Sequence, residues 1–121
     1  MASKTEVGRY RRLNGRFLRD GEVLLKKGDY IQASERFWGA AAEIVKAVAS
    51  MKGRKLRTHG NLFEYVRELN EAYPDLELVR DFLVASHLHS NFYEDELPGW
   101  AVEEAAEVVR AFVTKMEKFL K

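Results

Sequence analysis

Residues 30–48 carry the pattern that most restricts how this chain can fold. Apolar side chains recur there every three or four residues, and three consecutive alanines lie among them. An α-helix places residues at this spacing on one face, and alanines let a neighbouring helix approach closely. The segment is therefore predicted to be a helix with a strongly apolar face, and Trp38 is expected in the core.

A second long helix is predicted over residues 5–27, directly before the first. Gly28 suits the left-handed residue that ends a helix, and Asp29 followed by Gln32 suits the start of the next one. The turn between them is very short, so the two helices should form an antiparallel hairpin. Gly21 lies on the apolar stripe of the first helix, where a missing side chain would let the partner helix come close.

Further helices are expected after a basic connection at residues 51–60. Asn61 followed by Glu64 is a capping-box pattern that opens a short helix. Asp75 is expected to cap the next helix, and residues 90–99 are expected to form a loop.

Pro98 is expected in the first turn of the last helix, where its missing N–H is tolerated. No alternation of apolar and polar residues lasts long enough to predict a strand. The predicted fold class is all-α: an up-and-down antiparallel helical bundle of four long helices and one short helix. It should form a single domain over residues 1–121.

The composition excludes several classes of protein. The chain has no cysteine, and therefore no disulfide, thiolate metal site or cysteine nucleophile. No apolar run is long enough to cross a membrane, and the first residues lack the apolar core of a secretory signal, so a cytoplasmic location is expected. Phosphate-loop, GxSxG and HExxH motifs are absent, and no cofactor is expected.

Charge is distributed unevenly along the chain. Residues 1–60 hold 14 Lys and Arg against six Asp and Glu, whereas residues 61–121 hold six against 13. One reading is a face that binds polyanions, and the other is neutralisation of one half by the other within the fold or across a dimer. The basic positions fall into two clusters, Arg9, Arg11, Arg12, Arg16 and Arg19, and then Lys52, Arg54, Lys55 and Arg57. The second cluster has no acidic residue nearby in sequence and is the candidate nucleic-acid-binding segment.

The three histidines differ in their surroundings. His59 falls in the basic connection and is expected to be a solvated loop residue. Arg80 and His87 are seven residues apart, so a helix places them on one face, with Cα atoms roughly 10 Å apart along its axis. From there both could reach one phosphate group, whereas His89 should face another way.

A metal site is not expected near these histidines. His87 and His89 would supply only half of a tetrahedral set of ligands. Glu94, Asp95 and Glu96 could complete the set, but acidic residues this close to a helix start more often compensate the helix dipole.

Three aromatic residues, Phe92, Tyr93 and Trp100, surround the loop expected at residues 90–99. They are candidates for a pocket or a subunit interface. Base stacking is less favoured, because the loop is acidic and would repel phosphate. A homodimer is expected as well, since a chain this small has limited area for a core. Apolar residues beyond one stripe of the first and last helices are Leu18, Val23, Leu25, Val108, Val113 and Leu120.

Two segments resemble a known family. LLKKGDYIQASERFWGAAAEIVKAVA resembles the first two helices of HEPN domains, and ASHLHSNFYE is similar to the HEPN branch typified by archaeal PaREP1 proteins. The resemblance covers about residues 24–120.

The resemblance implies a four-helix bundle that pairs as a homodimer. Catalytic HEPN domains are metal-independent endoribonucleases with an Arg-x4–6-His motif, and the matching positions are Arg80, Asp81 and His87. The histidine would act as general acid and base on the ribose 2′-hydroxyl, and the arginine would stabilise charge on the phosphorus. His89 is the alternative catalytic residue.

Three functions follow from these features. The favoured one is a non-catalytic, homodimeric binding or assembly module with RNA or nucleotide contact. The first alternative is a metal-independent endoribonuclease that uses Arg80 and His87. The second is a partner subunit of a nucleotidyltransferase, because HEPN proteins often work in that way.

Overall fold

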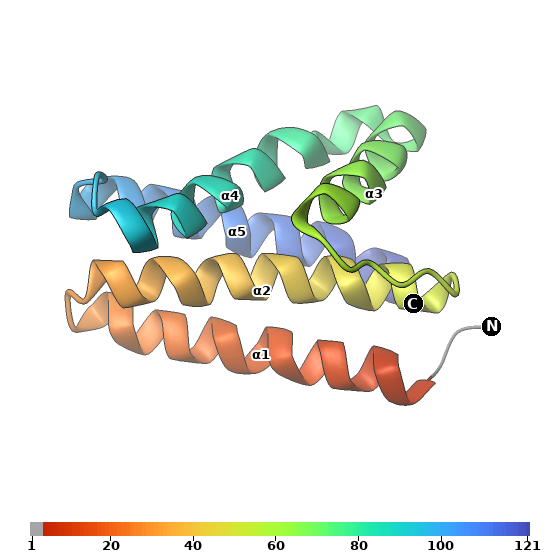
Figure 1. Cartoon of the computed structure of the whole chain (residues 1–121), viewed down its shortest axis with the longest axis horizontal. Coiled ribbons are helices and arrows are strands. Elements are labelled where there is room, and N and C mark those ends of the chain that lie inside the picture. The colour runs from red at the N-terminus through yellow and green to blue at the C-terminus, as the bar shows by residue number, and fades with distance from the viewer. Residues whose placement is uncertain (1–3) are drawn as a thin grey trace.

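The computed structural model describes residues 4–121, and its regular structure is entirely helical. No strand occurs within this range, so the prediction of an all-α, up-and-down bundle is confirmed. The 3₁₀ turn η1 joins α3 to α4, and a second one, η2, follows α5 (Figure 1). In chain order the elements are α1 (Lys4–Lys26), α2 (Tyr30–Met51), α3 (His59–Ala72), η1 (Pro74–Leu76), α4 (Leu78–Glu94), α5 (Gly99–Glu117) and η2 (Lys118–Leu120).

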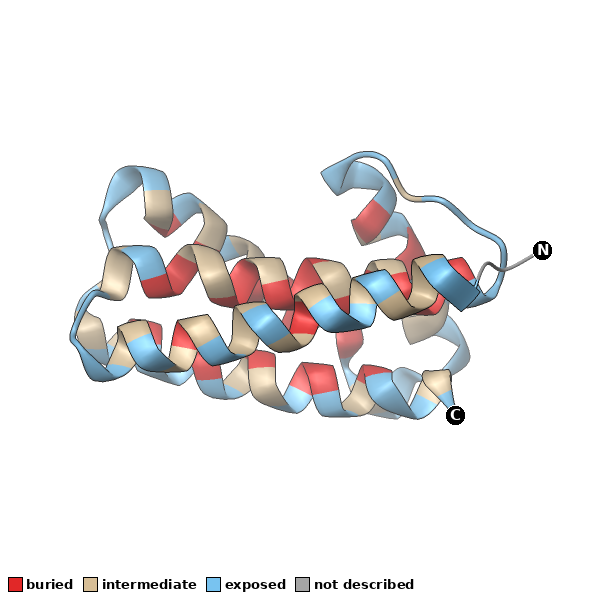
Figure 2. Cartoon of the chain, turned by 90° about the horizontal axis from the view of Figure 1, so that it is seen from below, coloured by how far each residue is buried: buried red, intermediate tan, exposed pale blue. Residues whose placement is uncertain are grey.

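α2 is the central helix of the bundle. It packs against each of the other four helices, and 13 of its 22 residues are buried. Trp38 is only 5% exposed, which confirms its predicted place in the core. Buried positions gather on the helix faces that look into the bundle, and exposed positions cover the outer faces and the connections (Figure 2).

α1 and α2 form the predicted hairpin, and two glycines let them approach closely. A Cβ atom at Gly21 would lie 2.9 Å from the ring of Phe37, and one at Gly39 would lie 2.9 Å from the ring of Phe17. Each helix therefore accepts an aromatic ring of the other at a position without a side chain. Gly28 has a φ of 76°, and Asp29 accepts a hydrogen bond from the N–H of Gln32, as the sequence predicted.

The start of α3 differs from the predicted one. Its N-cap is Thr58, three residues before the predicted Asn61, and the helix begins at His59. The Thr58 hydroxyl accepts from the Asn61 N–H, and the Asn61 side chain accepts in return from the Thr58 N–H. Asn61 thus takes the place that the sequence assigned to Glu64, because a carboxamide oxygen can close the same capping box.

The boundaries of α4 were also predicted wrongly. Asp75 lies in η1 rather than at the N-cap, which is Glu77 with a φ of 53°. At the other end, α4 continues to Glu94 through most of the expected loop, and Pro98 is the N-cap of α5 rather than a residue of its first turn. Asn91 explains the longer helix: its side chain donates to the Ser34 hydroxyl at 3.0 Å and accepts from the Leu97 N–H at 2.7 Å.

Most of the apolar residues noted beyond one stripe of the first and last helices belong to the core or pack against it. Val113 is buried, and Leu18, Leu25 and Leu120 pack against the core at partly buried positions. Val23 is the exception, with 52% exposure. None of the described helices combines the length and apolar character needed to cross a bilayer.

Candidate functional site

α4 carries the three residues of the predicted catalytic motif, and two of them lie at its surface. Arg80 is exposed, and its guanidinium lies 2.9 Å from the carboxylate of Glu77. His87 is exposed as well, about two helical turns further along. Both side chains are therefore accessible to a ligand.

Asp81, the third residue of that motif, is turned toward the bundle. Its side chain is 6% exposed and accepts a hydrogen bond from Lys115 of α5 at 2.8 Å. Lys115 also donates to the carbonyl of Leu76 at 2.7 Å. The ammonium of Lys115 therefore joins α5 to Asp81 of α4 and to η1, and Asp81 does not share the surroundings of Arg80 and His87.

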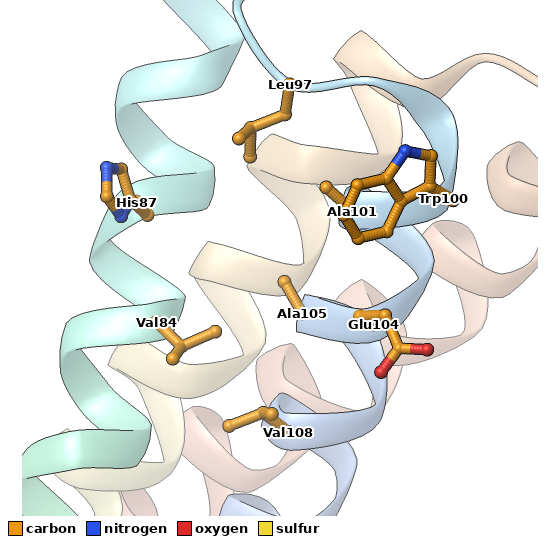
Figure 3. A pocket seen from close by; sticks show the side chains of 8 residues that line it. All are labelled: Val84, His87, Leu97, Trp100, Ala101, Glu104, Ala105 and Val108. Carbon is orange, nitrogen blue, oxygen red and sulfur yellow. The ribbon is translucent and has the colours of Figure 1, made fainter.

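A groove of about 300 Å³ runs between α4 and α5, and His87 lines it (Figure 3). Trp100 stands on the α5 wall and is 69% exposed. Leu83, one turn before His87 on α4, is 54% exposed. The other lining residues are mostly apolar: Val84, Leu97, Ala101, Glu104, Ala105 and Val108.

The end of this groove is acidic. A hydrogen bond and charge repulsion from Glu94 raise the pKa of Glu96, and the nearby His87 acts in the opposite direction. Two carboxylates therefore share the connection between α4 and α5. Negative charge beside His87 repels a phosphate group from this end of the groove. The groove is therefore better suited to contact with apolar groups.

His89, two residues after His87, lies in a different environment. Its Nδ1 is 2.8 Å from Oε1 of Glu35 on α2. Its ring contacts three others, those of Trp38, His59 and Tyr93, with centroids 5.3, 5.0 and 5.4 Å away. Residues from α2, α3 and α4 thus form one aromatic cluster around a histidine paired with a carboxylate.

The prediction that His59 is a solvated loop residue is wrong in one respect. His59 is exposed, but it is the first residue of α3, and its ring packs edge-on against Trp38 at 5.1 Å as well as against His89. The early start of α3 causes this, because it brings the ring back over α2.

The pair of Glu35 and His89 has a defined chemistry. An ionised carboxylate only accepts hydrogen bonds, so Nδ1 of His89 carries a hydrogen atom and donates a hydrogen bond to Glu35. Nε2 is then the nitrogen left for another partner, an arrangement that suits proton transfer. Glu35 was missed by the sequence reasoning, because 54 residues separate it from His89 and no local spacing links the two. Within residues 4–121, no group of three or more His, Cys, Asp or Glu side chains is placed to hold a metal ion.

The basic connection between α2 and α3 is exposed, and one of its four cations is already engaged. Arg54 makes two hydrogen bonds to the carboxylate of Glu68, at 2.9 and 3.3 Å, and lies over the ring of Tyr65. Lys52, Lys55 and Arg57 have no ion pair among the described residues, and all three are exposed. These three cations are the ones available to an anionic partner.

The other two aromatic residues expected at the groove lie beside it rather than in it. Phe92 and Tyr93 belong to the last turn of α4, and their rings contact each other with centroids 5.0 Å apart. Tyr93 is 71% exposed and faces the cluster of His89. Of the three predicted aromatics, only Trp100 lines the groove.

Fold and site together define a small all-helical bundle protein with an apolar groove between α4 and α5 and a histidine paired with a carboxylate between α2 and α4. The sequence model of the archaeal PaREP1/PaREP8 family matches residues 9–113, and the chain belongs to that family. It is also similar to the crystal structure of a protein from Sulfolobus solfataricus, with 26% sequence identity and a TM-score of 0.78. That match covers 90% of this chain and 97% of the other. The search of curated proteins found no match to this chain.

Proposed function

We propose that this protein is a homodimeric binding module and that the groove between α4 and α5 is the contact between its two copies. The observation that carries the proposal is the exposure of Trp100 and Leu83, at 69% and 54%, beside an apolar groove. Large apolar side chains next to a concave apolar surface are typical of association sites. The resemblance to HEPN domains, which pair as homodimers, supports a second copy as the occupant.

A two-fold contact also agrees with the shape of this surface. In such a contact the same patch serves both copies, so a protruding residue of one meets a hollow of the other. Trp100 protrudes and the groove beside it is hollow, so one surface offers both halves of the contact.

Light scattering at micromolar concentration tests the dimer. The expected mass of the wild-type protein is twice 14.0 kDa. Trp100→Glu places a charge in the contact and should give 14.0 kDa, whereas Val23→Glu, an equally drastic change on exposed α1, should not alter the mass. A wild-type mass of 14.0 kDa contradicts the proposal.

The module is proposed to contact RNA through the basic connection. Lys52, Lys55 and Arg57 present positive charge that nothing in the described structure neutralises. Replacing these residues and Arg54 with alanine should weaken RNA binding and lower its salt dependence. An unchanged affinity and salt slope would show that the connection is only a solvated loop.

The second candidate function is a metal-independent ribonuclease, and the pair of Glu35 and His89 favours it. In that reaction a histidine takes the proton of the 2′-hydroxyl, and the 2′-oxygen attacks phosphorus. The bond from phosphorus to the 5′-oxygen breaks, and the protonated histidine returns the proton to that oxygen. The products are a 2′,3′-cyclic phosphate and a 5′-hydroxyl. Loss of the acid–base group lowers cleavage by about 10²–10⁴-fold.

Matched variants separate the two histidines in a cleavage assay on RNA. If His87→Ala abolishes cleavage and His89→Ala does not, the residues predicted from the sequence motif, Arg80 and His87, carry the reaction. The opposite result assigns it to His89. Activity that disappears with EDTA and returns with a divalent ion contradicts the mechanism for both.

A further inference from the structure

α1 carries a row of arginines along its outer face. Arg9, Arg12, Arg16 and Arg19 follow one another at intervals of three, four and three residues, which places them on one side of the helix. All four are exposed. α1 lies at the edge of the bundle, against α2 (Figure 1), so its exposed residues are open to solvent.

A seven-residue repeat builds this row. The order Gly-Arg-aromatic-x-Arg occurs at residues 8–12 and again at residues 15–19. A Cβ at the first glycine would lie 3.3 Å from Nη1 of Arg12, and one at the second would lie 3.2 Å from Nη1 of Arg19. Each glycine thus leaves room for the guanidinium four residues later to lie close against the helix.

Ion pairs neutralise little of the charge of this row, as is also true of Arg11 and Arg57, although Arg9 interacts electrostatically with Glu43 of α2. Arg16 lies 3.9 Å from Asp20, which it shares with Arg36 at the same distance. The described structure gives no ion pair to the other three members of the row. Elsewhere in the chain, four arginines have a carboxylate oxygen within 3.0 Å: Arg54, Arg67, Arg80 and Arg110.

We infer that this row binds the phosphate backbone of duplex RNA. The row is about 15 Å long, from the rise of 1.5 Å per residue in a helix. A duplex holds its phosphates at fixed positions, so a straight, rigid row of cations can meet several of them without ordering a flexible strand. Binding of this kind is independent of base sequence.

The position of the row agrees with the RNA contact proposed for the connection between α2 and α3. The N-terminal end of α1 and that connection lie at the same end of the bundle (Figure 1). The inference rests on the proposed RNA contact and adds a second, longer surface to it. The acidic end of the α4/α5 groove lies at the opposite end, away from both.

Fluorescence anisotropy with a short labelled duplex RNA tests the row. Arg12→Gln with Arg19→Gln removes two charges that have no ion pair in the described structure. Each phosphate contact contributes about 0.9 to the slope of log K against log salt, so this slope should fall by about 2. Affinity at low salt should fall by more than about tenfold. Arg12→Lys with Arg19→Lys should retain most of the binding, because a point charge also attracts phosphate.

The matched control is Lys26→Gln with Lys27→Gln, which removes two exposed charges, one from the last residue of α1 and one from the turn that follows it. This pair should leave the slope unchanged, and thermal unfolding should show that all variants fold. Equal losses from the two pairs would overturn the inference. So would equal or tighter binding of the matching single strand.

Loss of binding only when the connection is changed would leave the proposed RNA contact standing and reject the row on α1. If the wild-type protein binds no RNA, both are rejected. Loss of the dimer in the Arg12/Arg19 variant, with RNA binding unchanged, would instead assign the row to contact with an acidic surface of a second copy, and this also overturns the inference.

Discussion

The two sides of α4 differ in how completely their polar side chains are engaged. Toward the bundle, Asp81 is paired with Lys115, His89 with Glu35, and Asn91 with two partners. Toward solvent, Arg80 has one exposed ion pair and His87 stands beside an apolar groove. Residues adjacent in sequence therefore lie in different environments. Side chains on the inward side bind α4 to the other helices, and those on the outward side are available to a partner.

The largest effect is expected at Asp81. Asp81→Ala leaves the ammonium of Lys115 in a largely buried position without its carboxylate, which should lower the free energy of unfolding by about 3 kcal/mol. Urea denaturation measures this. Arg80→Ala, next to it in sequence, removes an exposed pair and should change stability by less than about 1 kcal/mol. An equal loss of unfolding free energy in the two variants would contradict the difference between the inward and outward sides of α4.

A smaller loss is expected at Asn91. Asn91→Ala leaves the Leu97 N–H without its acceptor and removes a donor to the Ser34 hydroxyl, which still bonds to the Tyr30 carbonyl. An unsatisfied buried group costs about 1–3 kcal/mol of unfolding free energy. The last turn of α4 should also exchange its amide hydrogens faster. Ser90→Ala, at an exposed neighbouring position, is the control, and a similar effect there would argue against the role of Asn91.

The pairing of Glu35 with His89 should contribute about 1 kcal/mol, because both side chains are about a quarter exposed. Glu35→Ala removes the acceptor, and the Nδ1–H of His89 then loses its fixed partner. Nitrogen–proton correlation spectra of the imidazole report which nitrogen carries the proton. A neutral His89 ring protonated at Nε2 in the wild-type protein would contradict the described pairing.

The smallest effect on stability is expected at His87. His87→Ala should change the free energy of unfolding by less than about 0.5 kcal/mol, since the side chain is exposed and has no structural partner in the described region. Its effect should appear instead in the concentration at which the dimer dissociates, measured by sedimentation. A stability loss as large as that of Asp81→Ala would place His87 with the inward side.

Sequence reasoning succeeded where the signal was local. Gly28 and Asp29 end one helix and start the next through contacts within a few residues, and Gly21 lies on a stripe with helical spacing. It failed where distant residues decide the outcome. α4 runs past Ser90 because Asn91 bonds to Ser34, 57 residues away, a contact that leaves no mark on local spacing.

The candidate site shows the same limit. Spacing alone placed Arg80 and His87 on one side of a helix, and both are exposed. Spacing could not reveal that Asp81 pairs with Lys115, or that Glu35 and His59 converge on His89, because these partners come from other helices.

The central claim, that the outward side of α4 forms the contact between two copies, can be tested by a distance measurement between spin labels. The chain has no cysteine, so Leu83→Cys or Val23→Cys gives a single labelling site per copy. Both positions are exposed, one on α4 and the other on α1. The claim predicts a shorter distance between copies from residue 83 than from residue 23. A shorter distance from residue 23, or no coupling between labels at either position, would contradict it.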